Sequence, residues 1–158
     1  MKLVIMTKST FFVEEDKILT TLFDEGMDNL HLFKPGSTPL YAERLLSLIP
    51  EDYYRKITVH DHFYLKNEYD LAGIHLDSAD TEIPNNYKGK IGRTCTDIQM
   101  LKEMKKKSSC VFLKNIFDCI EFSEEKKTFT QQQLEDAADK GLIDRHVYAL
   151  GGMSLDNI

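Results

Sequence analysis

A chain of 158 residues, 42% of them hydrophobic, is long enough for one domain with a sizeable core, which argues against a disordered protein. The formal charge of -6 at pH 7, from 26 acidic and 20 basic residues, argues against a surface built to neutralise nucleic-acid phosphates. We therefore expect a small-molecule partner and no nucleic-acid partner.

The amino-terminal apolar run covers only residues 3–6, too short for the core of a signal peptide or for a membrane span. Three scattered cysteines match neither a disulfide framework nor a closed zinc site, and they fit a reducing compartment. These features predict a cytoplasmic protein with no membrane partner.

Short β-rich runs recur along the chain, and most precede a helical pattern. The runs are Leu3–Met6, Leu30–Phe33, Ile57–Val59, Gly73–Leu76, Lys90–Ile91, Cys110–Leu113 and His146–Leu150. The clearest helical patterns cover Tyr41–Ile49, Ile98–Met104 and Leu134–Leu142, whereas Ser78–Lys88 indicates a loop in place of a fourth helix. Alternating β and α elements predict a mostly parallel sheet in one α/β domain over residues 1–158, either a closed barrel or an open doubly wound sheet.

Helix starts have recognisable signals. Thr96 and Thr130 each precede a glutamine by three residues, the spacing of a capping box. Pro39 after Thr38 predicts a first helical position. Ser154 is positioned to cap a further helix after the glycine pair at 151–152.

Polar or phosphate-compatible residues follow nearly every predicted strand. The candidates are Lys34, His60, Asp61, Asp80, Thr94, Lys114, Gly151 and Gly152. Because barrel active sites are built from the loops after the strands, this recurrence predicts an active site at the carboxyl ends of the strands.

Asp61 and Asp80 are the candidate metal ligands. Carboxylate oxygens suit Mg²⁺, which takes one or two carboxylates together with substrate phosphates; the alternative is that each aspartate only caps a loop. His60 and His62 share a face of an extended segment, but no third zinc ligand lies nearby in the sequence. The histidines within strands, His31 and His75, are interpreted as ordinary strand residues.

The glycine pair Gly151-Gly152 follows an apolar strand. Glycines permit close approach of a ligand to the backbone, and a helix amino terminus at Ser154 would offer free N–H groups to an anion. The pair therefore predicts a phosphate site after the seventh strand, the alternative being a tight turn.

Six segments in order resemble the thiamine-phosphate synthase and thiazole tautomerase superfamily. They are Leu30–Pro35, Val59–His62, Gly73–Leu76, Gly92–Cys95, Phe112–Phe117 and Ala149–Met153. The resemblance covers almost the whole chain and implies a (β/α)8 TIM barrel. It also implies a transferase of thiamine biosynthesis that joins a hydroxymethylpyrimidine diphosphate to a thiazole phosphate and releases pyrophosphate with the help of Mg²⁺.

The resemblance further implies roles for single residues. Asp61 and Asp80 would hold Mg²⁺, and Lys34 would neutralise the diphosphate. Thr94 would sit beside the leaving group, and His60 stands where synthases usually carry an asparagine that contacts the pyrimidine or the phosphates. The glycine pair Gly151-Gly152 would cradle the thiazole phosphate.

Three departures from the family pattern keep two alternatives open. Phe33 replaces an arginine, Thr96 replaces the histidine of the tautomerase branch, and the segment after the sixth strand, which includes Lys114, lacks the usual proline and threonines. The alternatives are a thiazole tautomerase, against which Thr96 weighs, and a non-catalytic relative that binds thiazole phosphate or thiamine phosphate.

The chain is short for a complete barrel, which needs at least about 200 residues. We therefore expect the eighth βα unit to be missing, leaving unpaired edges on the first and seventh strands. Either a longer product has been shortened, or an open barrel closes by forming a homo-oligomer.

Overall fold

The computed structural model describes residues 2–158, which divide into two compact units. Unit 1 comprises the chain up to His75 together with Glu82–Lys90, and unit 2 comprises Leu76–Thr81 together with Ile91–Ile158. Among the described residues, no helix is long and apolar enough to cross a membrane.

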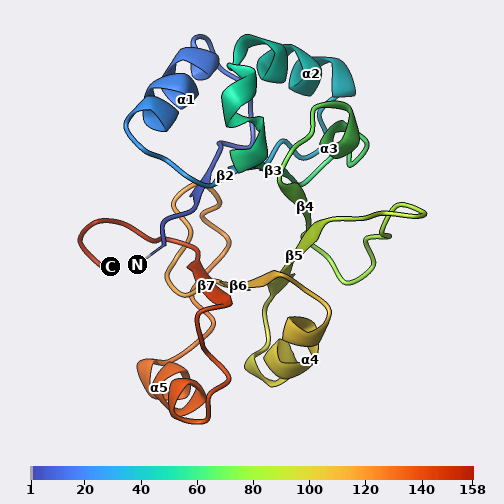
Figure 1. The fold of residues 1–158 in the computed structure, drawn as a ribbon. Coiled ribbons are helices and arrows are strands. Elements are labelled where there is room, and N and C mark those ends of the chain that lie inside the picture. Colours follow the sequence, from blue (N-terminus) through green and yellow to red (C-terminus); the bar gives the residue numbers. More distant parts are fainter. Residues whose placement is uncertain (1) are drawn as a thin grey trace. The chain divides into compact units, whose positions relative to one another are not determined.

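Unit 1 contains parallel strands that pair in sequence order. They are β1 (Ile5–Met6), β2 (Leu30–Leu32), β3 (Ile57–Val59) and most of β4 (Gly73–Leu76). The helices are α1 (Glu15–Asp24), α2 (Pro39–Leu48), the 3-10 helix η1 (Glu51–Lys56) and α3 (Leu65–Glu68). Helices α1 and α2 pack side by side (Figure 1).

The alternation of side chains along β2 and β3 separates the two faces of the unit 1 sheet. Leu30 pairs with Ile57 and Leu32 pairs with Val59, and all four are buried. Successive residues of a strand point to opposite faces, so His31 lies on the other face from Leu30 and Leu32. The same alternation assigns His60 and His75 to the face of His31.

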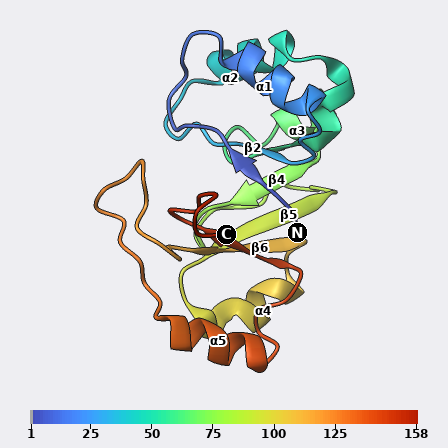
Figure 2. The same ribbon diagram turned by 90° about the vertical axis from the view of Figure 1, so that its left-hand side faces the viewer.

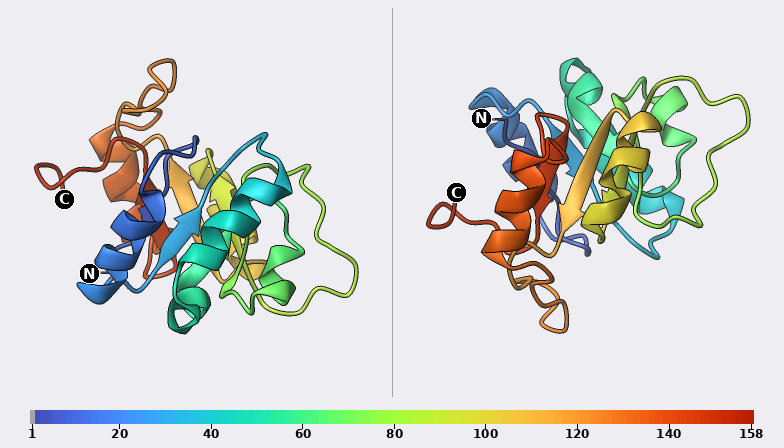
Figure 3. Two further views of the ribbon diagram at one scale, coloured as in Figure 1. Left: turned by 90° about the horizontal axis from the view of Figure 1, so that it is seen from above. Right: turned by 90° about the horizontal axis from the view of Figure 1, so that it is seen from below.

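Unit 2 contains most of β5 (Lys90–Cys95), followed by β6 (Cys110–Lys114) and β7 (Val147–Leu150), again parallel and in sequence order. The helices are η2 (Ile98–Met100), α4 (Leu101–Lys106) and α5 (Gln131–Asp139). A buried cluster of Cys95, Leu101, Val111, Leu113 and Phe129 forms its core. Figure 3 shows α4 beside β6, and Figure 2 shows the long loop between β6 and α5 in orange.

The parallel α/β class is confirmed, and closure into a barrel stays a prediction. Strands β3 and β4 have the predicted bounds, β5 runs four residues further than predicted, and residues 78–88 contain no helix. The capping box at Thr130 and the first helical position of Pro39 are confirmed.

Two predicted helix starts are wrong. Asp97 rather than Thr96 is the cap of η2, because the Asp97 carboxylate accepts the Gln99 N–H at 2.9 Å. No helix begins at Ser154; its hydroxyl oxygen accepts the Asp156 N–H within a turn instead. The predicted helix amino terminus beside the glycine pair is therefore absent from the described residues.

Candidate functional site

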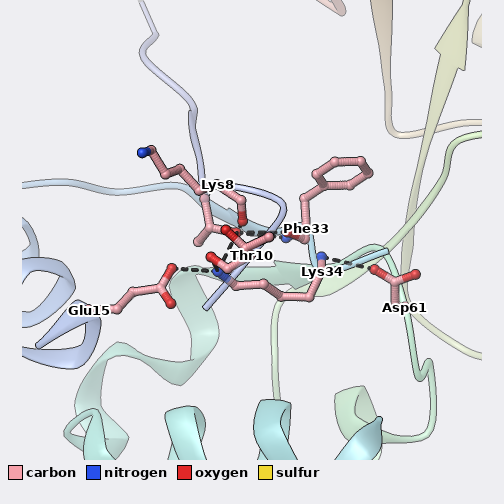
Figure 4. Close-up of polar contacts among 7 residues, drawn as sticks. Lys8, Thr10, Glu15, Phe33, Lys34 and Asp61 are labelled. Atoms are coloured by element: carbon pink, nitrogen blue, oxygen red, sulfur yellow. Dashed lines mark hydrogen bonds and ion pairs between the residues drawn. The ribbon is translucent and has the colours of Figure 1, made fainter. Parts of the chain in front are cut away.

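Within unit 1, the residues that follow β2 and β3 are joined directly. The Lys34 backbone N–H donates to Asp61 Oδ2 at 3.1 Å (Figure 4). Asp61 is half-buried, so this hydrogen bond fixes the orientation of a carboxylate that solvent still reaches. The prediction that these strand ends lie together is confirmed for this pair.

The Lys34 side chain is buried, and its ammonium group is held by three acceptors. Lys34 Nζ donates to Glu15 Oε1 at 2.6 Å and to the carbonyl oxygens of Lys8 and Thr10 at 3.0 Å each (Figure 4). It also lies 4.5 Å from the centre of the Phe11 ring. An ammonium group has three hydrogens, and all three are used here. A contact between Lys34 and a diphosphate stays a prediction, and it would require the Lys34 ammonium group to give up at least one of these three acceptors.

Three histidines gather on the face of the unit 1 sheet that carries His31. His31 Nδ1 and His60 Nε2 are 2.8 Å apart, within hydrogen-bond distance. The rings of His60 and His75 stack with centres 4.4 Å apart, and the His31 ring meets each of them edge-on. All three side chains are buried.

Burial also sets the protonation of this cluster. Removal from water, with His60 nearby, lowers the pKa of His31 from 6.5 to about 3. His31 is therefore neutral at pH 7 and can offer or accept a hydrogen bond, but it does not act as a buried cation.

His62 lies apart from the histidine cluster. It adopts a left-handed backbone conformation with a φ of 51°, and its Nε2 bonds to the Ser37 carbonyl oxygen at 2.8 Å. His60 and His62 therefore do not meet as a pair of zinc ligands. His60 instead lies beside His31 and His75.

In unit 2, Thr94 lies near the end of β5, and Asp77 and Asp80 follow β4. Thr94 Oγ1 donates to Asp77 Oδ1 at 3.2 Å. Asp80 is exposed, and its backbone N–H donates to Ser78 Oγ. Asp77 was not among the predicted ligands, although its place as the first residue after β4 is a usable sequence signal.

Lys114 at the end of β6 is partly exposed and pairs with Glu125, Nζ to Oε1, at 2.6 Å. Glu125 comes from the loop between β6 and α5, whose Cys119 N–H donates to the Glu125 carbonyl oxygen at 2.8 Å. Lys114 therefore reaches solvent beside a carboxylate rather than as an isolated cation.

The glycine pair after β7 packs against the segment that follows β6. Gly151 and Gly152 have φ values of 98° and 61°. A Cβ atom on Gly152 would lie 2.2 Å from the Asp118 carbonyl oxygen, and one on Gly151 would lie 3.0 Å from Asn115 Cα. Glycine is needed here for close packing within unit 2, so the tight-turn interpretation applies whether or not a phosphate also binds.

The two kinds of donor in these sites suit different metals. Asp61 in unit 1 and Asp80 in unit 2 each offer carboxylate oxygens, the donor type that a hard cation such as Mg²⁺ prefers, and Asp61 Oδ2 is already oriented by the Lys34 N–H. The imidazole nitrogens of the histidine cluster suit borderline transition metals instead.

The solved structures similar to the chain include two thiamine phosphate pyrophosphorylases. A thiamine phosphate pyrophosphorylase from Bacteroides thetaiotaomicron has a TM-score of 0.88 and 44% sequence identity, covering 99% of this chain and 75% of that one. A thiamine phosphate pyrophosphorylase from Pyrococcus furiosus has a TM-score of 0.69 and 17% identity over 98% of this chain and 76% of that one, which supports the fold alone. No protein-family model and no curated protein matches the chain.

Proposed function

Because the chain belongs to the thiamine phosphate pyrophosphorylase family, we propose that it catalyses the synthesis of thiamine phosphate. The observation that carries the proposal is 44% identity across 99% of the chain to one such enzyme. The substrates would be hydroxymethylpyrimidine diphosphate and thiazole phosphate. In the reaction the carbon–oxygen bond to the diphosphate breaks, a carbon–nitrogen bond to the thiazole forms, and pyrophosphate leaves.

Asp61 and Asp80 are the proposed ligands of Mg²⁺. A bound Mg²⁺ would neutralise the charge that develops on the leaving diphosphate. The support from unit 1 is the hydrogen bond from the Lys34 N–H, which orients the Asp61 carboxylate before any ligand binds. We therefore infer that Lys34 is a positioning residue, acting on the site through its backbone N–H and its buried side chain.

The remaining candidates are proposed to bind the substrates. Thr94 offers a hydroxyl group at the end of β5, and Lys114 offers a partly exposed ammonium group at the end of β6. The backbone of Gly151 and Gly152 would approach the thiazole phosphate closely because neither residue has a side chain. His60 would face the pyrimidine or its diphosphate.

The test is turnover of the purified chain with both substrates, measured as thiamine phosphate formed, in Mg²⁺ and again in EDTA. We expect activity in Mg²⁺ and its loss in EDTA. Asp61→Asn keeps a side-chain oxygen to accept the Lys34 N–H but removes the charge, and we expect about a 100-fold fall in kcat. Asp28→Asn is the matched control because Asp28 is 86% exposed and forms a loose ion pair with Lys56 at 3.6 Å.

Two outcomes would overturn the proposal. A folded chain that binds thiamine phosphate but forms none would identify a non-catalytic relative. Full activity in Asp61→Asn, with unfolding unchanged, would remove Asp61 from the metal site.

A further inference from the structure

The buried histidine cluster of unit 1 is not used by the proposed reaction except through His60. His31 lies on β2, His75 lies on β4, and His60 directly follows β3, so each ring comes from a different strand. Their relative exposures are 2%, 5% and 0% for His31, His60 and His75. Three imidazoles on adjacent parallel strands thus form one buried group that bulk solvent barely reaches.

The nitrogen atoms of the cluster are close enough to share one ion. One ligand nitrogen from each ring lies within 4.8 Å of the other two. Zinc–nitrogen bonds of about 2.0–2.1 Å in a tetrahedral site place ligand nitrogens about 3.3 Å apart. The 2.8 Å contact between His31 and His60 is shorter than this separation, and 4.8 Å is longer. Small ring rotations are therefore needed, with no change of strand pairing.

We propose that His31, His60 and His75 form a three-nitrogen site for a divalent transition-metal ion, with a fourth coordination position left open. The ion would be Zn²⁺, Co²⁺ or Ni²⁺, because neutral imidazoles favour these ions whereas Mg²⁺ prefers oxygen ligands. Three protein ligands with one open position is the arrangement of catalytic rather than structural zinc sites. This site shares no ligand with the carboxylates proposed for Mg²⁺, but it includes His60, so a bound ion would occupy the imidazole that the proposed function turns toward the substrate.

A metal ion can bind at this site without any proton leaving the three histidines. In the hydrogen bond between His31 and His60, one of the two facing nitrogens carries a hydrogen. When both nitrogens turn their lone pairs to the metal, that hydrogen moves to the other nitrogen of the same ring. Each imidazole remains neutral, so the bound ion keeps its charge of about +2. An anion or a water molecule would therefore favour the open position.

The direct test is metal binding by the full chain after chelator treatment. We would titrate Co²⁺ into the protein, follow its visible absorption after equilibration, and repeat the titration with Zn²⁺ by calorimetry. We expect one equivalent to bind, and excess Mg²⁺ not to displace it. X-ray absorption at the zinc edge should give nitrogen ligands at about 2.0–2.1 Å and no sulfur, which excludes the cysteines as ligands.

Two substitutions locate the site. His31→Gln and His75→Gln each remove one ligand, and we expect affinity for Co²⁺ to fall at least 10-fold in each, as metal-ligand changes commonly do. His146→Gln is the matched control: it removes a histidine that is 49% exposed and lies outside the cluster, so we expect affinity to stay unchanged.

The proposal is overturned if the unsubstituted chain, after chelator treatment, binds no Co²⁺ or Zn²⁺ at millimolar concentration, which would leave a cluster held only by hydrogen bonds and stacking. It is also overturned if both cluster variants bind as tightly as the parent, or if the X-ray spectrum shows sulfur ligands. The absorption measurement needs only the unsubstituted chain, so the test stands even where a variant fails to fold. None of these readouts depends on turnover.

Discussion

Two lysines at strand ends, one in each unit, form ion pairs of equal length in different surroundings. Lys34 in unit 1 and Lys114 in unit 2 each place Nζ 2.6 Å from a glutamate oxygen. The Lys34 side chain is 1% exposed and its partner Glu15 is 3% exposed, whereas Lys114 is 31% exposed. The distance is the same in the two pairs, so burial, together with the two carbonyl oxygens that also hold Lys34, decides how much each pair contributes and how freely each lysine can meet a ligand.

The largest expected effect is therefore the loss of the buried lysine. Lys34→Met leaves the Glu15 carboxylate buried without its partner, and Glu15 Oε2 already has no hydrogen-bond partner among residues 2–158. We expect the free energy of unfolding to fall by about 3–5 kcal/mol. Lys114→Met should change it by less than about 1 kcal/mol. Urea unfolding of both variants measures the contrast.

The double variant Lys34→Met/Glu15→Met sharpens the same comparison. Replacing both members of a buried pair by apolar side chains is often neutral, so we expect most of the lost stability to return. If Lys34→Met alone unfolds at the same urea concentration as the parent chain, the buried pair does not stabilise the fold as we expect.

The next largest effect concerns the glycines. Gly152→Ala in unit 2 combines a φ of 61° with a Cβ placed 2.2 Å from the Asp118 carbonyl oxygen. We expect it to lower stability by about 2–4 kcal/mol, since left-handed strain and overpacking add. Gly36 in unit 1 has a φ of 70°, but a Cβ atom added there would meet nothing within 4 Å. We therefore expect Gly36→Ala to lower the free energy of unfolding by only about 1–2 kcal/mol. If thermal unfolding shows the same loss of stability in both variants, Gly152 does not pack as closely against the Asp118 carbonyl oxygen as the structure indicates.

The pH dependence of stability tests the burial of His31. Its pKa is lowered from 6.5 to about 3, so between these pH values the unfolded chain binds more protons than the folded chain. The stability contribution is complete above pH 6.5 and is lost as the pH falls toward 3, by up to about 1.4 kcal/mol per pH unit.

We would compare urea unfolding at pH 6.5 and pH 5.5 in chelator, for the parent chain and for His31→Gln. The variant should show a shallower dependence. An identical slope in both chains would mean that His31 is protonated as readily in the folded protein as in the unfolded one. His146→Gln, in unit 2, controls for the removal of a histidine.

The smallest expected effect separates two helix caps. Thr130 accepts the Gln133 N–H at 3.2 Å and completes a capping box in unit 2, whereas the Thr38 side chain makes no cap hydrogen bond in unit 1. We expect Thr130→Ala to cost about 1 kcal/mol and Thr38→Ala a few tenths of that. Thermal unfolding of both variants is the measurement, and the reverse order would contradict the assignment.

Much of the fold was predictable because strands and caps depend on neighbouring residues. Ile57–Val59 and Gly73–Leu76 carry their strand signal locally, and Thr130 with Gln133 form a cap across one turn. Thr96 was chosen wrongly because Asp97, one residue later, offers an equally good acceptor, and spacing alone does not decide between them.

The candidate site was only partly predictable for a different reason. Lys34 and its partner Glu15 are 19 residues apart, and the sequence contains no signal that pairs them. The sequence alone favours ordinary strand roles for His31 and His75, because their contact with His60 depends on the register of three strands. That register follows from the fold and not from any local pattern.

The order of the strands has a consequence for synthesis of the chain. Within each unit every strand after the first pairs with the strand that precedes it in the sequence. A strand that leaves the ribosome therefore finds its partner already made, and no segment has to wait for a distant one. Loops of modest length close at each step, which lowers the entropic barrier that usually slows parallel sheets.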